Sequence, residues 1–324
     1  MKNAVQLRLI TQENFNAWSV WDSFLNQKAP NSRRLYEASI RLWVEYIGSD
    51  SQEDMIAVTH QHVFGFIAWL RERKAQPGRS ASISPTISAD TILLRVKTVQ
   101  IFYRQIVSVK LMTSNPVDYP LSLISRKRET RRPHNIIPFE KVNRLFDLCG
   151  DDIKGLRDRS FLSLLFGGGL RISEALNLRL CDVHQHDNGV QVMLRKTKNG
   201  ENKLHPIGYN ADFVVRMARF RFKSGANDDA PLLCSFSEIN TTGEVKKWDI
   251  KSAYRAFKTL CHKAGLTGVS PHSARATVIT KLLEDGVPHR EIMEFSRHAS
   301  IQMVEHYDKT RAGLAQKVAS KIKF

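Results

Sequence analysis

The sequence predicts a mainly α-helical protein of two domains: a four-helix bundle, then an α+β domain with a small antiparallel sheet. A chain of 324 residues is long for one domain and comfortable for two. Helical periodicity dominates both halves, whereas strand-like stretches occur only in the second. A segment dense in Arg and Lys separates the halves. We therefore expect domains at residues 1–118 and 138–324, joined by a basic linker at 119–137.

Four apolar stripes at helical spacing predict the bundle. They are Trp18, Trp21, Phe24 and Leu25; Leu35, Ile40, Trp43, Val44 and Ile47; Val63, Phe64, Phe66, Ile67, Trp69 and Leu70; and Ile92, Leu93, Val96, Val99, Phe102, Tyr103 and Ile106. A Pro-, Gly- and Ser-rich loop precedes the fourth stripe, and Asn115-Pro116 is expected to end that helix. Aromatic residues at this spacing are usually core residues, so we assign them to packing and not to base stacking.

The second half alternates helical and strand patterns. Helices are expected at residues 139–148, 160–166, 171–178, 211–222, 251–264, 273–284 and 290–295. Strands are expected at 190–194 and 204–207, on either side of an Asn199-Gly200 turn signal. Residues 311–324 carry apolar residues at helix-like intervals. Such a tail helix could dock on its own domain or on a neighbouring protomer, and the sequence does not choose between them.

The charge balance points to a polyanionic partner. There are 49 Lys and Arg against 32 Asp and Glu, a formal net charge of +17. Nucleic acid is favoured over a membrane, because no apolar run approaches the ~20 residues that span a bilayer. Candidate phosphate contacts lie on the bundle and in the linker: Arg33, Arg34, Arg95, Lys97, Arg126, Lys127, Arg128, Arg131 and Arg132. A solvated linker without DNA contacts is the alternative for the last five.

The cysteines and the first residues of the chain indicate in which cellular compartment the protein is expected. Four cysteines lie far apart without a CxxC pair, which is typical of buried free thiols in a reducing compartment. The first residues lack the apolar core of a secretion signal. We therefore expect a cytoplasmic protein that works where DNA is, at the nucleoid.

Tyr307 is the candidate nucleophile, because basic residues in characteristic segments precede it. A phenol with a pKa near ~10 is a poor nucleophile at neutral pH and needs a cationic pocket. Four segments supply the cations: Gly167-Gly-Gly-Leu-Arg171-Ile-Ser-Glu174, Thr197-Lys198-Asn199-Gly200, His272-Ser-Ala-Arg275, and Arg297-His298 upstream of Tyr307. Arginine suits a phosphate because its planar fork forms paired, charge-assisted hydrogen bonds.

Together these segments resemble the tyrosine recombinase family, also called phage integrases. The resemblance covers the C-terminal half motif by motif and the N-terminal half in helical pattern only. It implies a site-specific recombinase in which Tyr307 cleaves DNA through a 3′-phosphotyrosyl intermediate and Arg171 with Arg275 holds the phosphate. It also implies that Lys198 protonates the leaving 5′ oxygen, that His272 is a general base or phosphate ligand, and that His298 hydrogen-bonds the phosphate.

The resemblance further implies an assembly on double-stranded DNA. The N-terminal bundle would be a core-binding domain that clamps the duplex together with the catalytic domain. Two protomers would bind each site and a homotetramer would join two duplexes, with accessory DNA-bending proteins as possible partners. One departure stands out: Arg297 occupies a position where the family commonly has glycine. A phosphate contact by Arg297 is one expectation.

Several alternatives stay open at the level of sequence. Lys196 and Lys203 compete with Lys198 for the role of general acid, while Tyr209 and Tyr254 lack the spacing seen at Tyr307. A type IB topoisomerase, or a non-catalytic sequence-specific DNA-binding protein, would share much of this pattern. Whether the task is integration, excision or resolution of a mobile element is not encoded in these motifs.

Neither a cofactor nor a metal is expected. The phosphotyrosyl adduct keeps the bond energy, so ATP is not required, and the chain has no GxxxxGK[ST] loop. His272 and His298 have no carboxylate or thiolate at ligand spacing. The tract His184-Gln-His186-Asp187 resembles a metal site more closely, but we interpret it as a surface turn.

Overall fold

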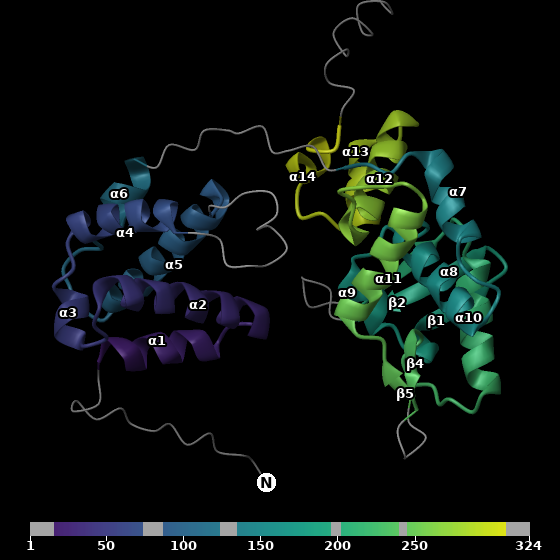
Figure 1. Cartoon of the computed structure of the whole chain (residues 1–324), viewed down its shortest axis with the longest axis horizontal. Coiled ribbons are helices and arrows are strands. Elements are labelled where there is room, and N and C mark those ends of the chain that lie inside the picture. The colour runs from purple at the N-terminus through teal and green to yellow at the C-terminus, as the bar shows by residue number, and fades with distance from the viewer. Residues whose placement is uncertain (1–15, 74–86, 124–134, 196–201, 240–244, 309–324) are drawn as a thin grey trace, which may run out of the picture. The chain divides into compact units, whose positions relative to one another are not determined.

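The computed structural model describes residues 16–73, 87–123, 135–195, 202–239 and 245–308 (Figure 1). The chain divides into two compact units, residues 1–129 and 130–324. The division falls inside the stretch expected to be a linker. Both units are mainly helical and the second carries antiparallel strands, which confirms the predicted fold class.

The described part of the first unit contains six helices: α1 (Ala17–Asn26), α2 (Pro30–Ile47), α3 (Gln52–Ile56), α4 (His60–Glu72), α5 (Ala89–Ser108) and α6 (Asp118–Leu123). The four long ones correspond to the four apolar stripes. The fourth ends at Ser108 and not at Asn115-Pro116 as expected, because Lys110 turns the chain with a left-handed φ of 62°. The short helix α6 occupies the start of the range predicted to be linker.

Helix α5 contacts α1, α2 and α4 and so forms the centre of the first unit. Trp21 and Trp43 are buried, as predicted for packing residues. The indole N–H of Trp43 donates to the Tyr103 hydroxyl at 3.1 Å, which in turn donates to the Met55 carbonyl at 3.0 Å. Each polar atom of this buried aromatic pair therefore has a partner, which removes the cost of burying it.

The second unit contains eight α-helices within its described residues: α7 (Phe139–Asp147), α8 (Ile153–Phe166), α9 (Ile172–Asn177), α10 (Asp212–Lys223), α11 (Ile250–Lys263), α12 (Pro271–Glu284), α13 (His289–Ser296) and α14 (Ile301–Glu305). A single 3₁₀ turn, η2 (Leu180–Asp182), follows α9. All helices except α14 overlap predicted ones. Helix α8 lies against both α10 and α12, and residues 160–166 are buried throughout.

Two small antiparallel sheets complete this unit. β1 (Val183–His186), β2 (Gly189–Leu194) and β3 (Lys203–Ile207) form one, and β4 (Cys234–Ile239) pairs with β5 (Val245–Lys247) in the other. In the first sheet Val192 of β2 lies between Val183 of β1 and His205 of β3. β2 and β3 are the predicted strands, whereas β1 replaces the turn expected at 184–187. The turn itself lies at Asp187 and Asn188, between the paired residues His186 and Gly189.

The four cysteines are free thiols, as predicted, although Cys181 is only half-buried while the other three are buried. Within the described ranges, no helix combines the length and the apolar character that crossing a bilayer requires.

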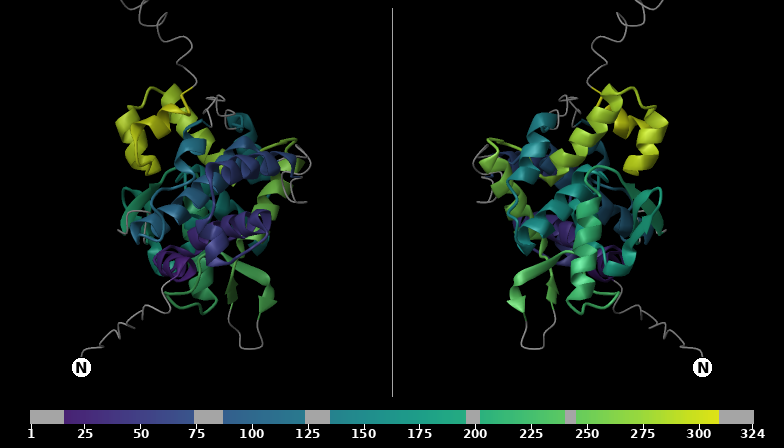
Figure 2. Two further views of the ribbon diagram at one scale, coloured as in Figure 1. Left: turned by 90° about the vertical axis from the view of Figure 1, so that its left-hand side faces the viewer. Right: turned by 90° about the vertical axis from the view of Figure 1, so that its right-hand side faces the viewer.

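The helices next to the candidate nucleophile form a separate small apolar cluster. Helices α12, α13 and α14 gather at one end of the second unit, opposite the β4–β5 hairpin (Figures 1 and 2). Their buried apolar side chains are Ala276, Ile279, Ile292 and Val304, and the Tyr307 ring packs with them. Apolar packing therefore fixes the ring of Tyr307 from one side.

Glycines connect the core helix α8 to the candidate site. A Cβ at Gly167 would lie 2.4 Å from the Tyr209 carbonyl oxygen and 2.7 Å from that of Ser163. Both obstacles are backbone atoms and cannot move aside easily. The turn between α8 and α9 therefore requires glycine at this position.

Gly167→Ala is expected to lower the free energy of unfolding by about 2 kcal/mol or more, since backbone must shift to admit the methyl group. Urea unfolding monitored by circular dichroism measures this. Gly208→Ala is the matched control, because its Cβ would meet only the Gly167 carbonyl oxygen, at 3.9 Å. A Gly167→Ala protein as stable as Gly208→Ala would contradict the assignment.

Candidate active site

Arg275 is the buried centre of the candidate site. It lies on the first turns of α12, where the Ser270 N–H donates to the Ser273 hydroxyl at 3.1 Å. Its side chain is 1% exposed, and Nη1 donates to the Gly169 carbonyl at 2.7 Å. Nη2 donates to the Ser296 carbonyl. The Nε–H is also buried and makes no hydrogen bond within the described residues.

Arg171 approaches the same region from the start of α9. It is the N-cap residue of that helix, and its Nη1 donates to Glu174 Oε1 at 2.7 Å. Its backbone N–H donates to Glu174 Oε2 at 2.8 Å. The Arg171 side chain is 38% exposed, so a ligand can reach it. Glu174 therefore holds the arginine at both ends without covering it.

His298 and Tyr307 complete the arrangement with His272. The His298 ring stacks on the Tyr307 ring at a centroid distance of 5.7 Å. Its Nε2 lies 3.4 Å from Arg275 Nη2, and its Nδ1 lies 2.8 Å from the Ser296 hydroxyl. The Tyr307 hydroxyl lies 3.5 Å from Nε2 of the exposed His272. Five of the six predicted catalytic side chains are thus brought into one part of the second unit.

Burial and the shared positive charge perturb the protonation of these groups. Burial, followed by the charges of Arg275 and Arg171, lowers the pKa of His298 to about 4. Burial, then the charges of Arg171 and Arg297, lowers the pKa of Arg275 to about 10. At neutral pH His298 is therefore an uncharged hydrogen-bonding group, while Arg275 stays cationic.

The Arg297 guanidinium is held by protein side chains beside the site. Its Nη2 donates to Glu174 Oε2 at 2.7 Å, and its Nη1 lies 2.9 Å from His205 Nδ1. The backbone of Arg297 has φ of 56° and ψ of 42°, the left-handed conformation that ends α13. That conformation favours glycine, which explains physically why a glycine is common at this position.

His205 is a site neighbour that the sequence analysis did not identify. It is 1% exposed, and its Nε2 donates to the Gly168 carbonyl at 2.7 Å. Burial, then the charge of Arg297, lowers the pKa of His205 to about 4. Its alternation with Leu204 and Pro206 on β3 indicates that it faces inward, but not what it would contact.

Two buried histidines make stability depend on pH. His205 and His298 bind no proton in the folded chain above pH about 4, whereas unfolded histidine binds one below about 6.5. The unfolded chain therefore binds more protons between these values, and stability falls as pH decreases through this window. Each group contributes up to about 3 kcal/mol.

We expect the thermal midpoint to fall steeply from pH 6.5 to 4.5, and His205→Gln to flatten that dependence. Glutamine can still donate to Gly168 and accept from Arg297, but it does not titrate. Calorimetry across the pH range measures the effect. His186→Gln, at an exposed position, is the control and should follow wild type. Identical pH dependence for all three proteins would show that His205 is not a titrating group.

Lys198 and its rival Lys196 lie outside the described residues. The other rival, Lys203, is on β3 and pairs with Glu294 at 3.4 Å. Of the alternative tyrosines, Tyr209 donates to Asn143 and Tyr254 lies on α11. Tyr307 is the tyrosine that stacks on His298 and approaches His272.

Basic residues on the first unit differ in their surroundings. Arg33 and Arg34 are exposed, and Arg33 pairs with Glu37 at 2.7 Å. Arg95 and Lys97 are half-buried on α5, and Arg95 donates to the Ser39 hydroxyl at 2.8 Å. A phosphate would compete with that bond, so Arg95 is the least available of the four. The linker candidates Arg126, Lys127, Arg128, Arg131 and Arg132 lie outside the described residues.

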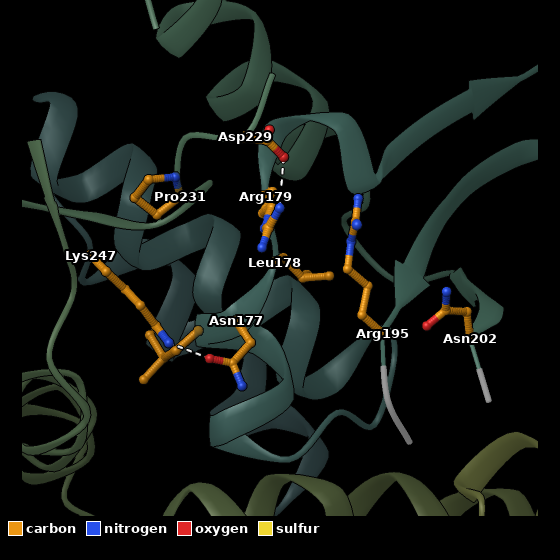
Figure 3. Close-up of a pocket in the computed structure, with 9 residues that line it drawn as sticks. Asn177, Leu178, Arg179, Arg195, Asn202, Asp229, Pro231 and Lys247 are labelled. Carbon is orange, nitrogen blue, oxygen red and sulfur yellow. Dashed lines mark hydrogen bonds and ion pairs between the residues drawn. The ribbon is translucent and has the colours of Figure 1, made fainter. Parts of the chain in front are cut away.

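A basic pocket of about 700 Å³ lies beside the end of α9 and the β2 strand (Figure 3). Arg179, Arg195 and Lys247 line it. Arg179 pairs with Asp229 at 2.7 Å, and Lys247 donates to Asn177. Sequence reasoning missed these residues because they come from three separate elements. Arg195 immediately precedes the segment that carries Lys198.

Within the described ranges, no group of three or more His, Cys, Asp or Glu residues is placed to hold an ion. His184 and His186 lie on β1, with ring centroids 6.3 Å apart. The arrangement around Tyr307 offers a phenol, two guanidiniums and two imidazoles, which suits attack on a phosphodiester.

Comparison with known proteins agrees with the chemistry that these side chains suit. Residues 135–312, more than half of the chain, match the model of the phage integrase family. The tyrosine recombinase XerC of Myxococcus xanthus is 27% identical over 291 residues, covering 86% of this chain and 87% of the relative. The tyrosine recombinase XerD of Mycobacterium tuberculosis is 27% identical over 285 residues, covering 86% and 87%.

Solved structures share the fold. The Tn1549 transposon integrase in complex with transposon right end DNA gives a TM-score of 0.69 at 17% identity, covering 95% of this chain and 99% of that one. The XerH site-specific recombinase bound to palindromic difH substrate gives 0.68 at 14% identity, covering 90% and 80%. At such identities the likeness shows a common fold.

Proposed function

The chain belongs to the phage integrase family and is a tyrosine-type site-specific recombinase, in which we propose that Tyr307 is the nucleophile that cleaves and rejoins DNA strands. The observation that carries this proposal is the position of the phenol. Its ring lies on His298 beside the buried Arg275, and its hydroxyl lies next to His272. A tyrosine in such surroundings can be deprotonated while the phosphate it attacks is held.

The phosphorus atom keeps two ester bonds at each stage of the reaction. The Tyr307 oxygen bonds to phosphorus, and the bond from phosphorus to the 5′ oxygen breaks, which leaves a 3′-phosphotyrosyl link. His272 accepts the phenol proton, and Lys198 gives a proton to the departing 5′ oxygen. A 5′ hydroxyl from another strand then attacks the link, which restores a phosphodiester and releases Tyr307.

Each side chain around the phosphate has a separate part in this scheme. Arg171 and Arg275 bind the nonbridging oxygens, where negative charge accumulates in the transition state. His298 is neutral at working pH and donates a hydrogen bond to the same phosphate. For this donation Nε2 must carry the proton, so the 3.4 Å approach of the Arg275 Nη2 donor to Nε2 has to give way when the phosphate binds.

The partner of this chemistry is double-stranded DNA at specific sites. A lambda integrase dimer bound to a COC′ core site, with a TM-score of 0.63 at 12% identity, shares this fold. We propose one dimer per site and a homotetramer across two sites, with accessory DNA-bending proteins, in the movement or resolution of a DNA element. The basic residues around Arg179, Arg195 and Lys247 would add contacts to the DNA backbone.

A trapping experiment tests the proposal without knowledge of the target sequence. Wild-type protein is incubated with a library of nicked duplexes of randomised sequence, in which the short cleaved fragment diffuses away. DNA that stays attached after denaturation is recovered and sequenced. One recurrent sequence linked through its 3′ phosphate is the expected result. Adducts without sequence preference, with relaxation of supercoiled plasmid, would indicate a type IB topoisomerase.

A further inference from the structure

The left-handed turn after α13 contains a charged residue whose side chain is largely buried beside the site. Arg297 has φ of 56°, and its side chain is 9% exposed. Such a conformation is uncommon for a residue with a Cβ, and glycine would adopt it without strain. A partly buried arginine in a strained turn suggests that the side chain has a function which outweighs the local cost.

The bonds of Arg297 identify that function. Glu174 Oε2 accepts from Arg297 Nη2 at 2.7 Å, while Glu174 Oε1 accepts from Arg171 Nη1 at 2.7 Å. One carboxylate therefore lies between two guanidiniums. The trio of Arg171, Glu174 and Arg297 carries a net charge of about +1, whereas Arg171 and Glu174 alone would cancel.

His205 fixes Arg297 in this position from the other side. His205 Nε2 donates to the Gly168 carbonyl at 2.7 Å, and Arg297 Nη1 lies 2.9 Å from His205 Nδ1 and 3.1 Å from its Nε2, so the guanidinium packs against the imidazole ring. Arg297 Nη1 also donates to the Phe295 carbonyl at 3.2 Å. The guanidinium is therefore oriented by three elements: β3, the end of α13 and α9.

We propose that Arg297 is a positioning residue that neutralises Glu174, so that Glu174 orients Arg171 without cancelling the positive charge Arg171 presents to the scissile phosphate. This inference rests on the proposed function, since it specifies how that site binds its phosphate. Arg297 touches no phosphate itself. It acts through Glu174, and the glycine common at this position would leave the carboxylate to Arg171 alone.

The test is a charge cycle between two positions. Arg297→Gln removes the charge and leaves the Arg171–Glu174 pair neutral. Arg297→Lys keeps the charge. The double variant Glu174→Gln with Arg297→Gln removes both opposite charges and restores the net charge of the wild-type trio. Two measurements are made on the full-length chain: the single-turnover rate of adduct formation on a nicked duplex, and binding of inorganic phosphate.

Phosphate binding is followed by NMR of the ¹³C-labelled histidine rings, with the His298 signal identified by His298→Gln. We expect Arg297→Gln to weaken phosphate binding and to slow adduct formation by about tenfold or more, as loss of one charge at a partly buried site requires. Arg297→Lys should stay within about threefold of wild type, and the double variant should recover most of the loss.

Two results would overturn the inference. One is an Arg297→Gln protein equal to wild type in both measurements. The other is a double variant as impaired as Arg297→Gln, which would mean that Arg297 contributes only packing. Thermal melts identify any variant that fails to fold. If Arg297→Gln is unfolded, the comparison of Arg297→Lys with the double variant tests the role of Arg297 instead. If wild type forms no adduct, the proposed function fails, whereas the phosphate titrations still test the role of Arg297.

Discussion

Tyr307→Phe is expected to abolish covalent attachment to a nicked target duplex, with a rate at least about 10⁴-fold below wild type. The change removes the only atom that forms the bond to phosphorus, and neither neighbouring histidine is a substitute for it in this geometry. Duplex binding, measured by gel shift, should stay within about twofold, because the basic residues that contact phosphates are untouched.

The loss is expected to be chemical and not structural. Phenylalanine keeps the ring that packs against Val304 and stacks on His298, and it gives up only the hydroxyl that lies 3.5 Å from His272. The thermal midpoint should therefore change little. Tyr209→Phe and Tyr254→Phe are the matched controls, and both should form adduct at the wild-type rate. Adduct formation by Tyr307→Phe, with loss in either control, would reassign the nucleophile.

Arg275→Ala is expected to lose both activity and stability. Adduct formation should fall by about 10³-fold, since a charge-assisted contact with the transition state is lost. The free energy of unfolding should fall by about 3 kcal/mol, because the buried carbonyls of Gly169 and Ser296 lose their donor and a large cavity is left.

Arg171→Ala separates the two effects. Its side chain is 38% exposed and bonds to Glu174, which keeps Arg297 as a partner. We expect a comparable loss of adduct formation but a change in unfolding free energy below about 1 kcal/mol. Urea unfolding and single-turnover cleavage, measured on both variants, test this contrast. Equal stability of Arg171→Ala and Arg275→Ala would contradict the burial assigned to Arg275.

Elements with an apolar period were predictable from sequence, whereas α14 and β1 were not. Helices such as α5 and α12 span enough turns to show an apolar stripe, so their existence was correctly predicted. α14 covers only Ile301–Glu305 and shows no period of its own. β1 was interpreted as a turn because its alternating His and Gln carry no apolar signal. Both elements exist because the surrounding unit supplies their partners.

The candidate site also contains residues that local motifs indicated and one that they did not. The order of Arg171, His272, Arg275, His298 and Tyr307 along the chain was enough to predict one phosphate-binding tyrosine site, because each residue lies in a recognisable local motif. Lys198 also rests on such a motif and stays a prediction. No local motif indicated His205, which contributes through its contact with Arg297, 92 positions away in sequence.

The sequence by itself determined which chemical groups we propose to act in this protein: a phenol, two guanidiniums, a lysine and two imidazoles on a basic helical chain. Only the tertiary structure decided how charge is shared among them. A phosphate contact by Arg297 was one expectation from the sequence, and the structure adds that its guanidinium bonds to Glu174 of α9 and approaches His205 of β3. Pairing between residues distant in sequence depends on how elements pack, and a local pattern of residues does not record that packing.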